Sequence, residues 1–326
     1  MRGKKLIVAA TAVLLTGCGS GSGSDGAAAP STSAPTAAPT PSAAADLAVV
    51  DLSGLVFELA ALGVPVAGGI YSAEFSGPTL DGIDGLDPQV KAETLAAPAV
   101  TEGLELDVEA LVEVDPDLIV IDESYVPYYG DTLDQAREVA EVKVIPSGTW
   151  QATTLALADA VGRHDAGQQR VTAGETAITD LTAAVSGAGK AGTSVSLLRY
   201  FQQPLAFVPP SLPSQVVTAA GLEQPAAQGP GTENDGGLPD AQAQKKLSQE
   251  VLGKHDADVL VFGYSSDADK ELATFEELPV VAQLPVVRSG RVGTVPYFLW
   301  ALNSAVGVDR IVDDLQSIVV DETYAG

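Results

Sequence analysis

One basic side chain stands at a position where the sequence could bind an anionic group. Arg199 ends the apolar run 195–198 in a chain that has 17 Lys and Arg against 43 Asp and Glu. A guanidinium is well suited to hold carboxylate, catecholate or hydroxamate oxygens. It could instead extend to the surface or pair with one of the many acids. Arg199 is therefore a candidate ligand contact, with a surface or ion-paired position as the alternative.

Aromatic side chains gather just after the apolar runs that resemble strands. Aromatic residues make up only 5% of the chain, yet most Tyr and Trp fall at these positions. Rings with polar tips suit a binding pocket, although rings that cap a core would give the same pattern. The candidates are Tyr71, Tyr125, Tyr128, Trp150, Tyr200, Tyr264, Tyr297 and Trp300, accompanied by Ser124, Tyr129, Phe201 and Phe298.

The elements that would position these side chains alternate between short apolar runs and helical patterns, which is typical of α/β units with mainly parallel strands. The runs are 47–52, 64–70, 118–121, 142–145, 195–198, 259–262 and 291–295. Between the fourth and the fifth run, helical spacing continues for longer than an ordinary crossover helix. We predict an N-terminal α/β lobe over 46–150, one linking helix over 151–188 and a C-terminal α/β lobe over 189–326. Ligands of open α/β sheets bind beyond the carboxyl ends of the strands, so the candidates should face a cleft between the lobes.

An internal repeat supports two lobes built on one plan. Residues 107–120 align without gaps on residues 248–261, and Glu109 aligns with Glu250. Each copy reads as an N-cap residue, a glutamate in the first helical turn, a short helix, an acidic turn and a buried strand. Favourable placement of an acid at a helix N-terminus is one sufficient explanation for both glutamates.

The first residues resemble an export signal. Three basic residues precede the apolar run 6–15, which is too short to span a bilayer that needs about 20 residues. Leu15, Thr16, Gly17 and Cys18 then resemble the lipobox of bacterial lipoproteins. We expect residues 1–17 to be a signal peptide and Cys18 to carry a lipid anchor on the outer face of the cytoplasmic membrane.

Composition restricts the remaining possibilities. Residues 18–45 are rich in Gly, Ser, Ala, Pro and Thr, which predicts a disordered linker. Cys18 is the only cysteine, so no internal disulfide is possible. The formal net charge of -26 argues against nucleic acid as a partner.

Phrases spread over residues 46–320 resemble one known family. They are Leu62-Gly63-Val64, Pro116-Asp117-Leu118-Ile119-Val120, Val161-Gly162-Arg163, Ala220-Gly221-Leu222, Asp256-Ala257-Asp258-Val259-Leu260, Trp300 and Asp313-Asp314-Leu315. In this order and spacing the chain resembles the periplasmic-binding-protein family for ferric siderophores, haem and cobalamin, the substrate-binding proteins of ABC importers.

The resemblance implies a fold and a set of partners. It implies two Rossmann-like lobes joined by one long helix, which is the class III periplasmic-binding-protein fold, with a small hinge motion. It also implies a monomer that delivers a ferric siderophore to a permease dimer in the cytoplasmic membrane. In this family an arginine at the place of Arg199 often contacts the ligand, and glutamates at the places of Glu109 and Glu250 pair with permease arginines.

Other functions find less support in the sequence. The chain has only His164 and His255, both expected to face solvent, so a site with several histidines for a metal ion cannot form. No Gly-x-Ser-x-Gly turn is present for a hydrolase nucleophile, and we expect no enzyme activity and no cofactor. Haem and cobalamin remain open as ligands. The small number of bases slightly favours a ferric hydroxamate over a highly anionic catecholate.

Overall fold

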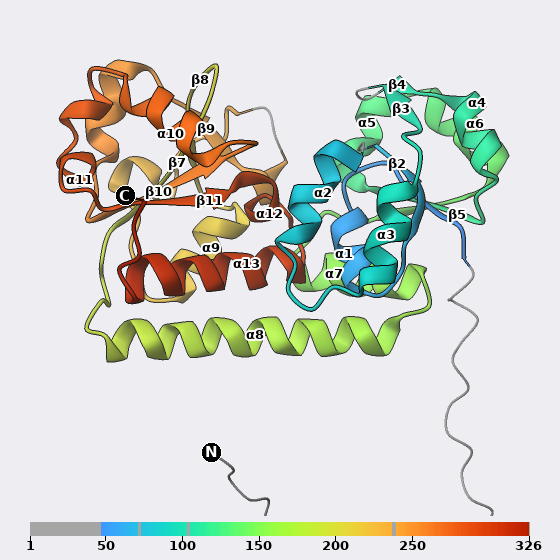
Figure 1. Ribbon diagram of the computed structural model, residues 1–326, viewed down its shortest axis with the longest axis horizontal. Helices are drawn as coiled ribbons and strands as arrows, with labels where there is room; N and C mark the ends of the chain where they lie inside the picture. Colours follow the sequence, from blue (N-terminus) through green and yellow to red (C-terminus); the bar gives the residue numbers. More distant parts are fainter. Residues whose placement is uncertain (1–46, 71–72, 103–104, 237–238, 326) are drawn as a thin grey trace, which may run out of the picture. The chain divides into compact units, whose positions relative to one another are not determined.

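The computed structural model describes residues 47–70, 73–102, 105–236 and 239–325, and of residues 73–75 and 241 the backbone alone. The predicted signal peptide 1–17, Cys18, the linker 18–45 and Tyr71 lie outside the described residues. The described residues belong to one compact unit that contains two large sheets with their helices and one short two-stranded sheet (Figure 1). Within them, no helix is both long enough and apolar enough to cross a membrane.

The N-terminal lobe is built on a parallel sheet of four strands in the order β2 (Val66–Gly69), β1 (Val49–Asp51), β5 (Leu118–Asp122) and β6 (Glu141–Ile145). Strands covered on both faces need apolar residues at successive positions. Val49 and Val120 accordingly pack on one face with α1 (Val56–Ala61) and α7 (Trp150–Ala160). Val50 and Ile119 pack on the other face with α4 (Val108–Val114) and α6 (Thr132–Val139).

Shorter elements complete this lobe. They are α2 (Ala73–Asp81), α3 (Pro88–Ala96), the hairpin of β3 (Thr101–Glu102) and β4 (Glu105–Leu106), the 3-10 helix η2 (Glu123–Tyr125) and α5 (Val126–Tyr129). The chain leaves β1 toward β2 on one side and later adds β5 on the other side. The carboxyl ends of β1 and β5 therefore form the switch point at which α/β sheets bind ligands.

The C-terminal lobe has five strands in the order β11 (Val292–Pro296), β10 (Val259–Tyr264), β7 (Val195–Phe201), β8 (Gln203–Phe207) and β9 (Gln244–Lys246). The first three are parallel, and β8 and β9 add antiparallel strands at one edge. Every apolar run that predicted a strand contains one, and the predicted α/β class is confirmed.

Helices cover both faces of the second sheet. α8 (His164–Gly187), α9 (Leu212–Ala219) and α13 (Ala305–Leu315) enclose one cluster of buried residues. α10 (Ala268–Glu276) and α11 (Pro285–Arg288) enclose the other. The remaining elements are α12 (Tyr297–Trp300), the π-helical turn η7 (Gln316–Val320) and the 3-10 helices η3 (Ala226–Gln228), η4 (Asp240–Gln242), η5 (Gln249–His255) and η6 (Val281–Gln283).

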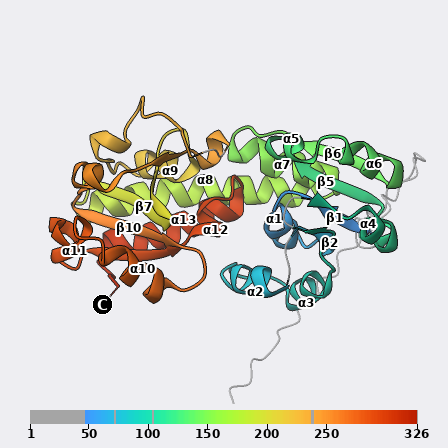
Figure 2. The same cartoon turned by 90° about the horizontal axis from the view of Figure 1, so that it is seen from above.

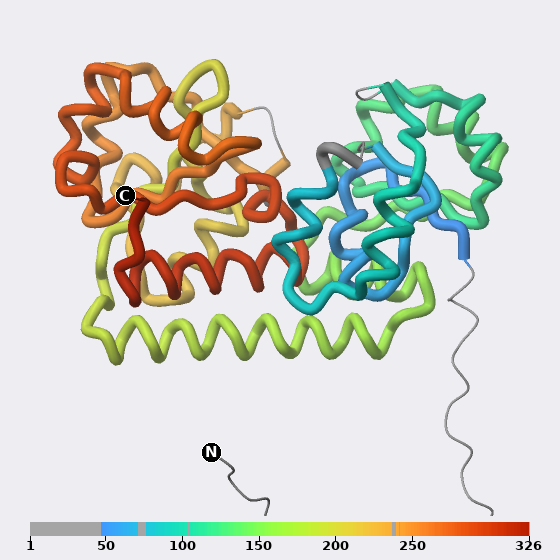
Figure 3. The backbone as a smooth tube through the Cα atoms, in the orientation of Figure 1, coloured from blue at the N-terminus to red at the C-terminus, as the bar shows by residue number. Residues whose placement is uncertain are grey.

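The prediction of one continuous linking helix over 151–188 is wrong, because two helices occupy that range. α7 ends at Ala160 and α8 begins at His164. Gly162 between them has a φ of 67°, a left-handed conformation that ends helices and that glycine adopts without steric cost. α8 alone runs beneath both lobes (Figures 2 and 3). Its 24 residues give it a length of about 36 Å.

The internal repeat has a structural purpose in both lobes. Asp117 Oδ2 accepts a hydrogen bond of 2.9 Å from the N–H of Ala48, just before β1. In the second copy, Asp258 Oδ2 accepts one of 3.0 Å from the N–H of Ser194, just before β7. Each acidic turn therefore fastens the start of the central strand to the neighbouring strand. The two helices differ, because α4 is an α-helix whereas η5 is a 3-10 helix.

Candidate ligand-binding cleft

A buried carboxylate marks the carboxyl end of β1. Asp51 is fully buried, and its Oδ1 accepts hydrogen bonds from the backbone N–H of Ser53 at 2.9 Å and from Ser53 Oγ at 3.1 Å. Its Oδ2 accepts from the N–H groups of Gly54 and Val56, both at 2.9 Å. Burial nevertheless raises the pKa of Asp51 to about 6, because these donors carry no charge.

Serines join this strand end to the ends of β5 and β6, the next two strands on one side of the sheet. The N–H of Asp122, at the end of β5, donates to Ser53 Oγ at 2.7 Å. Asp122 Oδ1 accepts from Ser124 N–H at 2.8 Å and from the hydroxyls of Ser124 and Ser147, both at 2.5 Å. Ser147 follows β6. The ends of β1, β5 and β6 thus form one hydrogen-bonded polar surface that carries two carboxylates.

Tyrosines stand beside this surface. Tyr129 is buried and its hydroxyl donates to the carbonyl of Leu52 at 2.8 Å. Tyr125 packs against Tyr128, with ring centroids 6.0 Å apart. Burial raises the pKa of Tyr125 to about 12, with further contributions from the charges of Tyr297, Asp51 and Asp122. Tyr125 therefore lies within electrostatic range of Tyr297, which belongs to the other lobe.

Arg199 lies near the end of β7 against Tyr297. The guanidinium carbon is 3.5 Å from the centre of the Tyr297 ring and 5.4 Å from that of Phe201. Only 7% of Arg199 is exposed, and no carboxylate of the described residues forms an ion pair with it. Burial lowers the pKa of Arg199 below its usual 12.5, while Tyr297 and Glu271 favour the charged form. A buried, unpaired guanidinium has donors left for an anionic oxygen.

A cleft opens between the lobes at the carboxyl ends of the first sheet. Its outer chamber has a volume of about 350 Å³ and is lined by Glu123, Ser124, Ser147 and Gly148 of one lobe and by Pro210, Gln215, Pro239 and Asp240 of the other. A deeper slot of about 40 Å³ shares Ser124, Ser147 and Pro239 with the chamber. Its further lining consists of Ser53, Gly54, Leu55, Glu58, Asp122, Tyr125, Thr153, Gln242, Leu302, Asn303 and Ser304.

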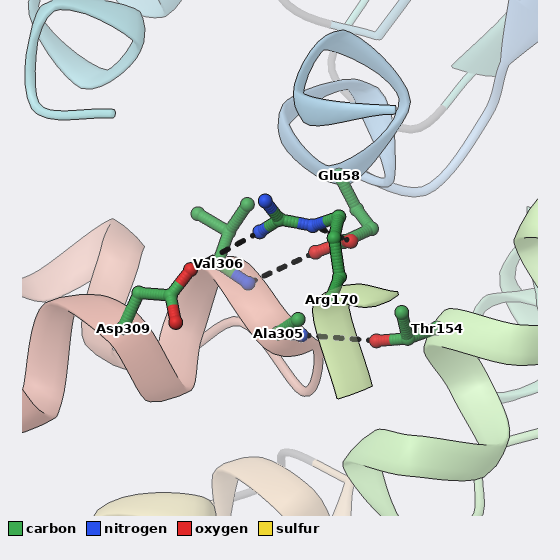
Figure 4. A network of polar contacts seen from close by, with 6 residues as sticks. All are labelled: Glu58, Thr154, Arg170, Ala305, Val306 and Asp309. Atoms are coloured by element: carbon green, nitrogen blue, oxygen red, sulfur yellow. Dashed lines mark hydrogen bonds and ion pairs between the residues drawn. The ribbon is translucent and has the colours of Figure 1, made fainter. Parts of the chain in front are cut away.

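The base of the cleft is held by polar contacts that cross between the lobes (Figure 4). Glu58 of α1 is 1% exposed, and its Oε1 pairs with Arg170 Nε of α8 at 2.7 Å. Its Oε2 accepts the N–H of Val306, in the first turn of α13, at 2.9 Å. Thr154 Oγ1 of α7 accepts the N–H of Ala305 at 2.9 Å. Side chains of the first lobe therefore cap a helix of the second.

Two tryptophans predicted to contact ligand are core residues instead. Trp150 is 5% exposed and packs against α8, where a Cβ at Gly174 would approach its ring to 2.9 Å. Trp300 is fully buried, and its Nε1 donates to Asp314 Oδ2 at 2.7 Å. Indole rings bury more apolar area than any other side chain, so the core is the favourable place for them once the N–H has a partner.

The other predicted aromatics are divided between the cleft and the lobes. Tyr125 lines the slot. Tyr200 and Tyr264 pack against the cluster around Phe275 and are not among the residues that line the described chamber or slot. Tyr128 is 52% exposed beside the cleft. Tyr297 is 7% exposed, with one ring face against Arg199 and its hydroxyl accepting from Gln244 Nε2 at 3.2 Å.

Several cleft residues have no counterpart among the predicted site residues. Ser53, Asp122 and Ser147 line the slot, and the buried Asp51 holds the turn that carries Ser53. Asp122 and Ser147 follow strands after which aromatics were predicted, whereas Asp51 and Ser53 end a strand after which none was. The signal for them was the Asp, Ser and Gly residues that follow these three apolar runs. Ser304 and its neighbours before α13 have no comparable sequence signal. The chain path alone brings them to the slot.

The two histidines lie in different environments. His164 is exposed at the start of α8, as expected, and Asp159 raises its pKa. The expectation of an exposed His255 is wrong: it is 3% exposed, with Nδ1 3.1 Å from Gln228 Nε2. The turn of the repeat packs inward here, and burial lowers the pKa of His255 to about 4. Within the described residues, no three His, Cys, Asp or Glu side chains are grouped to hold a metal ion.

Glu109 and Glu250 are both exposed in the first turns of α4 and η5. Asp107 caps α4 by accepting the N–H of Ala110 at 3.0 Å. Ser248 makes no such side-chain bond at the start of η5. The glutamates occupy equivalent places in the two lobes, and neither carboxylate forms an ion pair with another described residue.

Comparison with known proteins places this fold. One similar structure is the siderophore periplasmic binding protein from the fuscachelin gene cluster of Thermobifida fusca, with a TM-score of 0.65 and 19% identity over 84% of this chain and 96% of that one. FhuD2 from Staphylococcus aureus with bound ferrioxamine B has a TM-score of 0.64 and 17% identity over 84% and 98%.

A third similar structure is the Fe3+-Desferal-bound siderophore binding protein FhuD from Vibrio cholerae, with a TM-score of 0.63 and 18% identity over 84% and 98%. No curated protein matches the chain by sequence. Residues 81–297 match the sequence model of the family described as periplasmic binding protein. The predicted family resemblance and class III fold are confirmed, and the chain belongs to the periplasmic binding protein family.

Proposed function

We propose that the protein captures a ferric siderophore in the inter-lobe cleft and delivers it to an ABC permease. The observation that carries the proposal is Arg199, a buried guanidinium near the carboxyl end of β7 that has no carboxylate partner among the described residues. It does not itself line the chamber or the slot, but it packs on Tyr297, which lies within electrostatic range of Tyr125 in the slot. A charge in that state is costly unless a ligand supplies the missing oxygen. Two of the similar solved structures are named as siderophore binding proteins and a third has ferrioxamine B bound, which supports the same ligand class here.

Within this class we favour a ferric hydroxamate. The chamber and the slot are lined by Glu58, Asp122, Glu123 and Asp240 and by no lysine or arginine of the described residues. A ferric tris-catecholate carries several negative charges and would meet repulsion from these carboxylates. A ferric trihydroxamate core is neutral and avoids it.

The test is a titration of the purified full-length chain, followed by its intrinsic fluorescence. Ferric hydroxamates, ferric catecholates, ferric citrate, haem and cobalamin are compared. We expect saturable quenching by a ferric hydroxamate with a Kd below about 1 μM. Tight binding of haem or cobalamin alone would mean that this compound, and not a ferric siderophore, is the ligand. If folded protein bound none of the compounds, the proposal would be overturned.

A pair of variants tests the role of Arg199. We expect Arg199→Gln to weaken binding of the ferric hydroxamate by about 10- to 100-fold, the range of one charge-assisted hydrogen bond. Arg291→Gln is the matched control, because Arg291 is exposed at the opposite end of the second sheet. Equal affinities of the two variants would remove Arg199 from the site.

We also propose that the protein works outside the cytoplasm on a lipid anchor at Cys18. The membership of the periplasmic binding protein family supports the location. The lipobox-like residues before Cys18 support the anchor. Fractionation of cells that express Cys18→Ala tests it: the variant should leave the membrane fraction, and continued retention there would argue against the anchor.

A further inference from the structure

The deeper slot of the cleft carries a negative charge that no described residue balances. Of its two lining carboxylates, Glu58 is paired with Arg170. Asp122 has only neutral donors, from Ser124 and Ser147. All of these bonds reach Oδ1, and no described residue donates to Oδ2. Asp51, one strand away, is likewise bonded only to uncharged groups.

A second observation at the slot is independent of these acids. Ser304 lines the slot and is 2% exposed, yet its Oγ has no hydrogen-bond partner among the described residues. Ser304 precedes α13 but makes no capping bond from its side chain. Thr154 and Glu58 already accept the N–H groups of Ala305 and Val306. A buried hydroxyl without a partner is costly, so this Oγ is available to a group that enters the slot.

The size of the slot limits what that group can be. A cavity needs about 10 to 15 Å³ to hold one water, so 40 Å³ admits a group of a few heavy atoms. The chamber of about 350 Å³ that adjoins it is within the range of small-molecule sites. A ligand can therefore leave its bulk in the chamber and place one short arm in the slot.

We propose that the slot binds a protonated primary amine on the ligand, with Asp122 as its counter-charge and Ser304 Oγ as a neutral acceptor. This inference rests on the proposed function and specifies its ligand as a ferric hydroxamate with a free ammonium arm, which makes the chelate cationic. An ammonium group has three donors and no acceptor, which matches a slot rich in carboxylate and hydroxyl oxygens. The formal net charge of -26 would also attract such a ligand.

The decisive experiment compares two ligands that differ only in the arm. Ferrioxamine B carries a free primary ammonium, and its N-acetyl derivative keeps the same ferric chelate without the charge. Isothermal titration of the full-length protein should give a Kd about 10- to 100-fold lower for the ammonium form, as one charge-assisted hydrogen bond predicts. Equal affinity for both would overturn the inference and leave the proposed function intact. No binding of either form would also overturn the inference, and the proposed function would then be decided by the wider ligand panel described above.

Variants of the slot residues test whether the preference for the ammonium form arises in the slot. Asp122→Asn and Ser304→Ala should each reduce the ratio of the two affinities, that is, the preference for the ammonium form over the acetylated form. Glu123→Gln is the control, because it removes the same charge one residue away but lines the chamber alone. If Glu123→Gln abolishes the preference as fully as Asp122→Asn does, the slot is not the site.

Two variants are used so that the test remains informative if one of them misfolds. Asp122 joins two strand ends, so its loss could perturb the local fold. Ser304→Ala removes only an oxygen with no described partner. An unchanged preference in Ser304→Ala would exclude its role whatever happens to Asp122→Asn, and the two-ligand comparison on the unmodified chain decides the ammonium arm in either case.

Discussion

Buried charges are paired at the base of the inter-lobe cleft and unpaired at the carboxyl ends of the strands β5 and β7. At the base, Glu58 meets Arg170 and the N–H of Val306, so its buried carboxylate is neutralised and hydrogen-bonded. By contrast, Asp122 in the slot and Arg199 near the carboxyl end of β7 have no partner of opposite charge among the described residues. Pairing removes most of the cost of burying a charge, whereas an unpaired charge keeps it. The difference indicates that the paired charges at the base stabilise the fold, whereas the unpaired charges of Asp122 and Arg199 can pair with a ligand.

The largest effect should come from breaking the base. Glu58→Ala leaves Arg170 without its buried partner and the N–H of Val306 without an acceptor. We expect a loss of about 3 to 5 kcal/mol in the free energy of unfolding, as for other buried ion pairs that lose one member. Urea unfolding measures it.

Asp309→Asn is the matched control for this prediction. Asp309 also pairs with Arg170, at 3.3 Å, but 46% of its side chain is exposed. An exposed pair contributes about 0 to 1 kcal/mol. If Glu58→Ala cost no more than Asp309→Asn, the base would not be the stabilising region that the comparison requires.

A second buried polar network, within the C-terminal lobe, should give a pH-dependent effect. Burial lowers the pKa of His255 to about 4, from an ordinary value of 6.5. Between pH 6.5 and 4 the unfolded chain binds a proton that the folded chain does not, so this group destabilises the fold as the pH falls through that window. At pH 4.5 the loss should reach about 2 to 3 kcal/mol relative to pH 7.

The comparison with His255→Gln isolates this contribution. Asp51 and Asp309 have pKa values raised to about 6, and the folded chain therefore binds their protons first and gains stability as the pH falls from 6 to 4. Both proteins share that opposing effect. The free energy of unfolding of the variant, relative to the unmodified chain, should rise by about 2 to 3 kcal/mol between pH 7 and 4.5. A constant difference would mean that His255 is not held neutral.

The backbone was predictable where apolar runs determined it. The central strand β5 is buried on two faces, so it appears as the unbroken apolar run 118–121, whereas the edge strand β6 is largely exposed and includes Lys143. β9, with the sequence Gln-Lys-Lys, is an edge strand without that signal. The break in the linking helix depended on the single Gly162, whose effect is a backbone conformation that helical spacing does not reveal.

The site was less predictable because position at a strand end does not fix the direction of a side chain. Trp150 and Trp300 stand at predicted strand ends but turn into the core, where their large rings find more apolar area. Short residues such as Ser53 and Ser147 cannot turn away, and they line the cleft. Glu58 is the single acid within the apolar stretch 56–62, and an acid in such a stretch indicates a buried, paired carboxylate.

A smaller effect on stability should follow from removing the unpaired charge of Arg199. Arg199→Leu removes a buried guanidinium and its contact with the Tyr297 ring. The lost cation–π contact is worth about 0.5 to 2 kcal/mol, and the relief of burying an unpaired charge offsets it. We therefore expect the ligand-free protein to change by no more than about 1 kcal/mol in urea unfolding. A loss as large as that of Glu58→Ala would show that Arg199 is structural and would remove the contrast between the two regions.

The smallest effect on the fold is expected at Glu109 and Glu250, where we propose that the permease docks. Each lies exposed in a first helical turn, and such a charge contributes about 0.3 to 1 kcal/mol. The double variant to Gln should therefore remain folded and bind the ferric hydroxamate as before, yet reduce its uptake by cells because it has lost two charges that would face permease arginines. Glu113→Gln, on the exposed side of the same helix as Glu109, is the control. Undiminished uptake by the double variant would leave the glutamates as helix-terminal charges alone, and the repeat would then serve the fold of each lobe rather than the transfer of ligand.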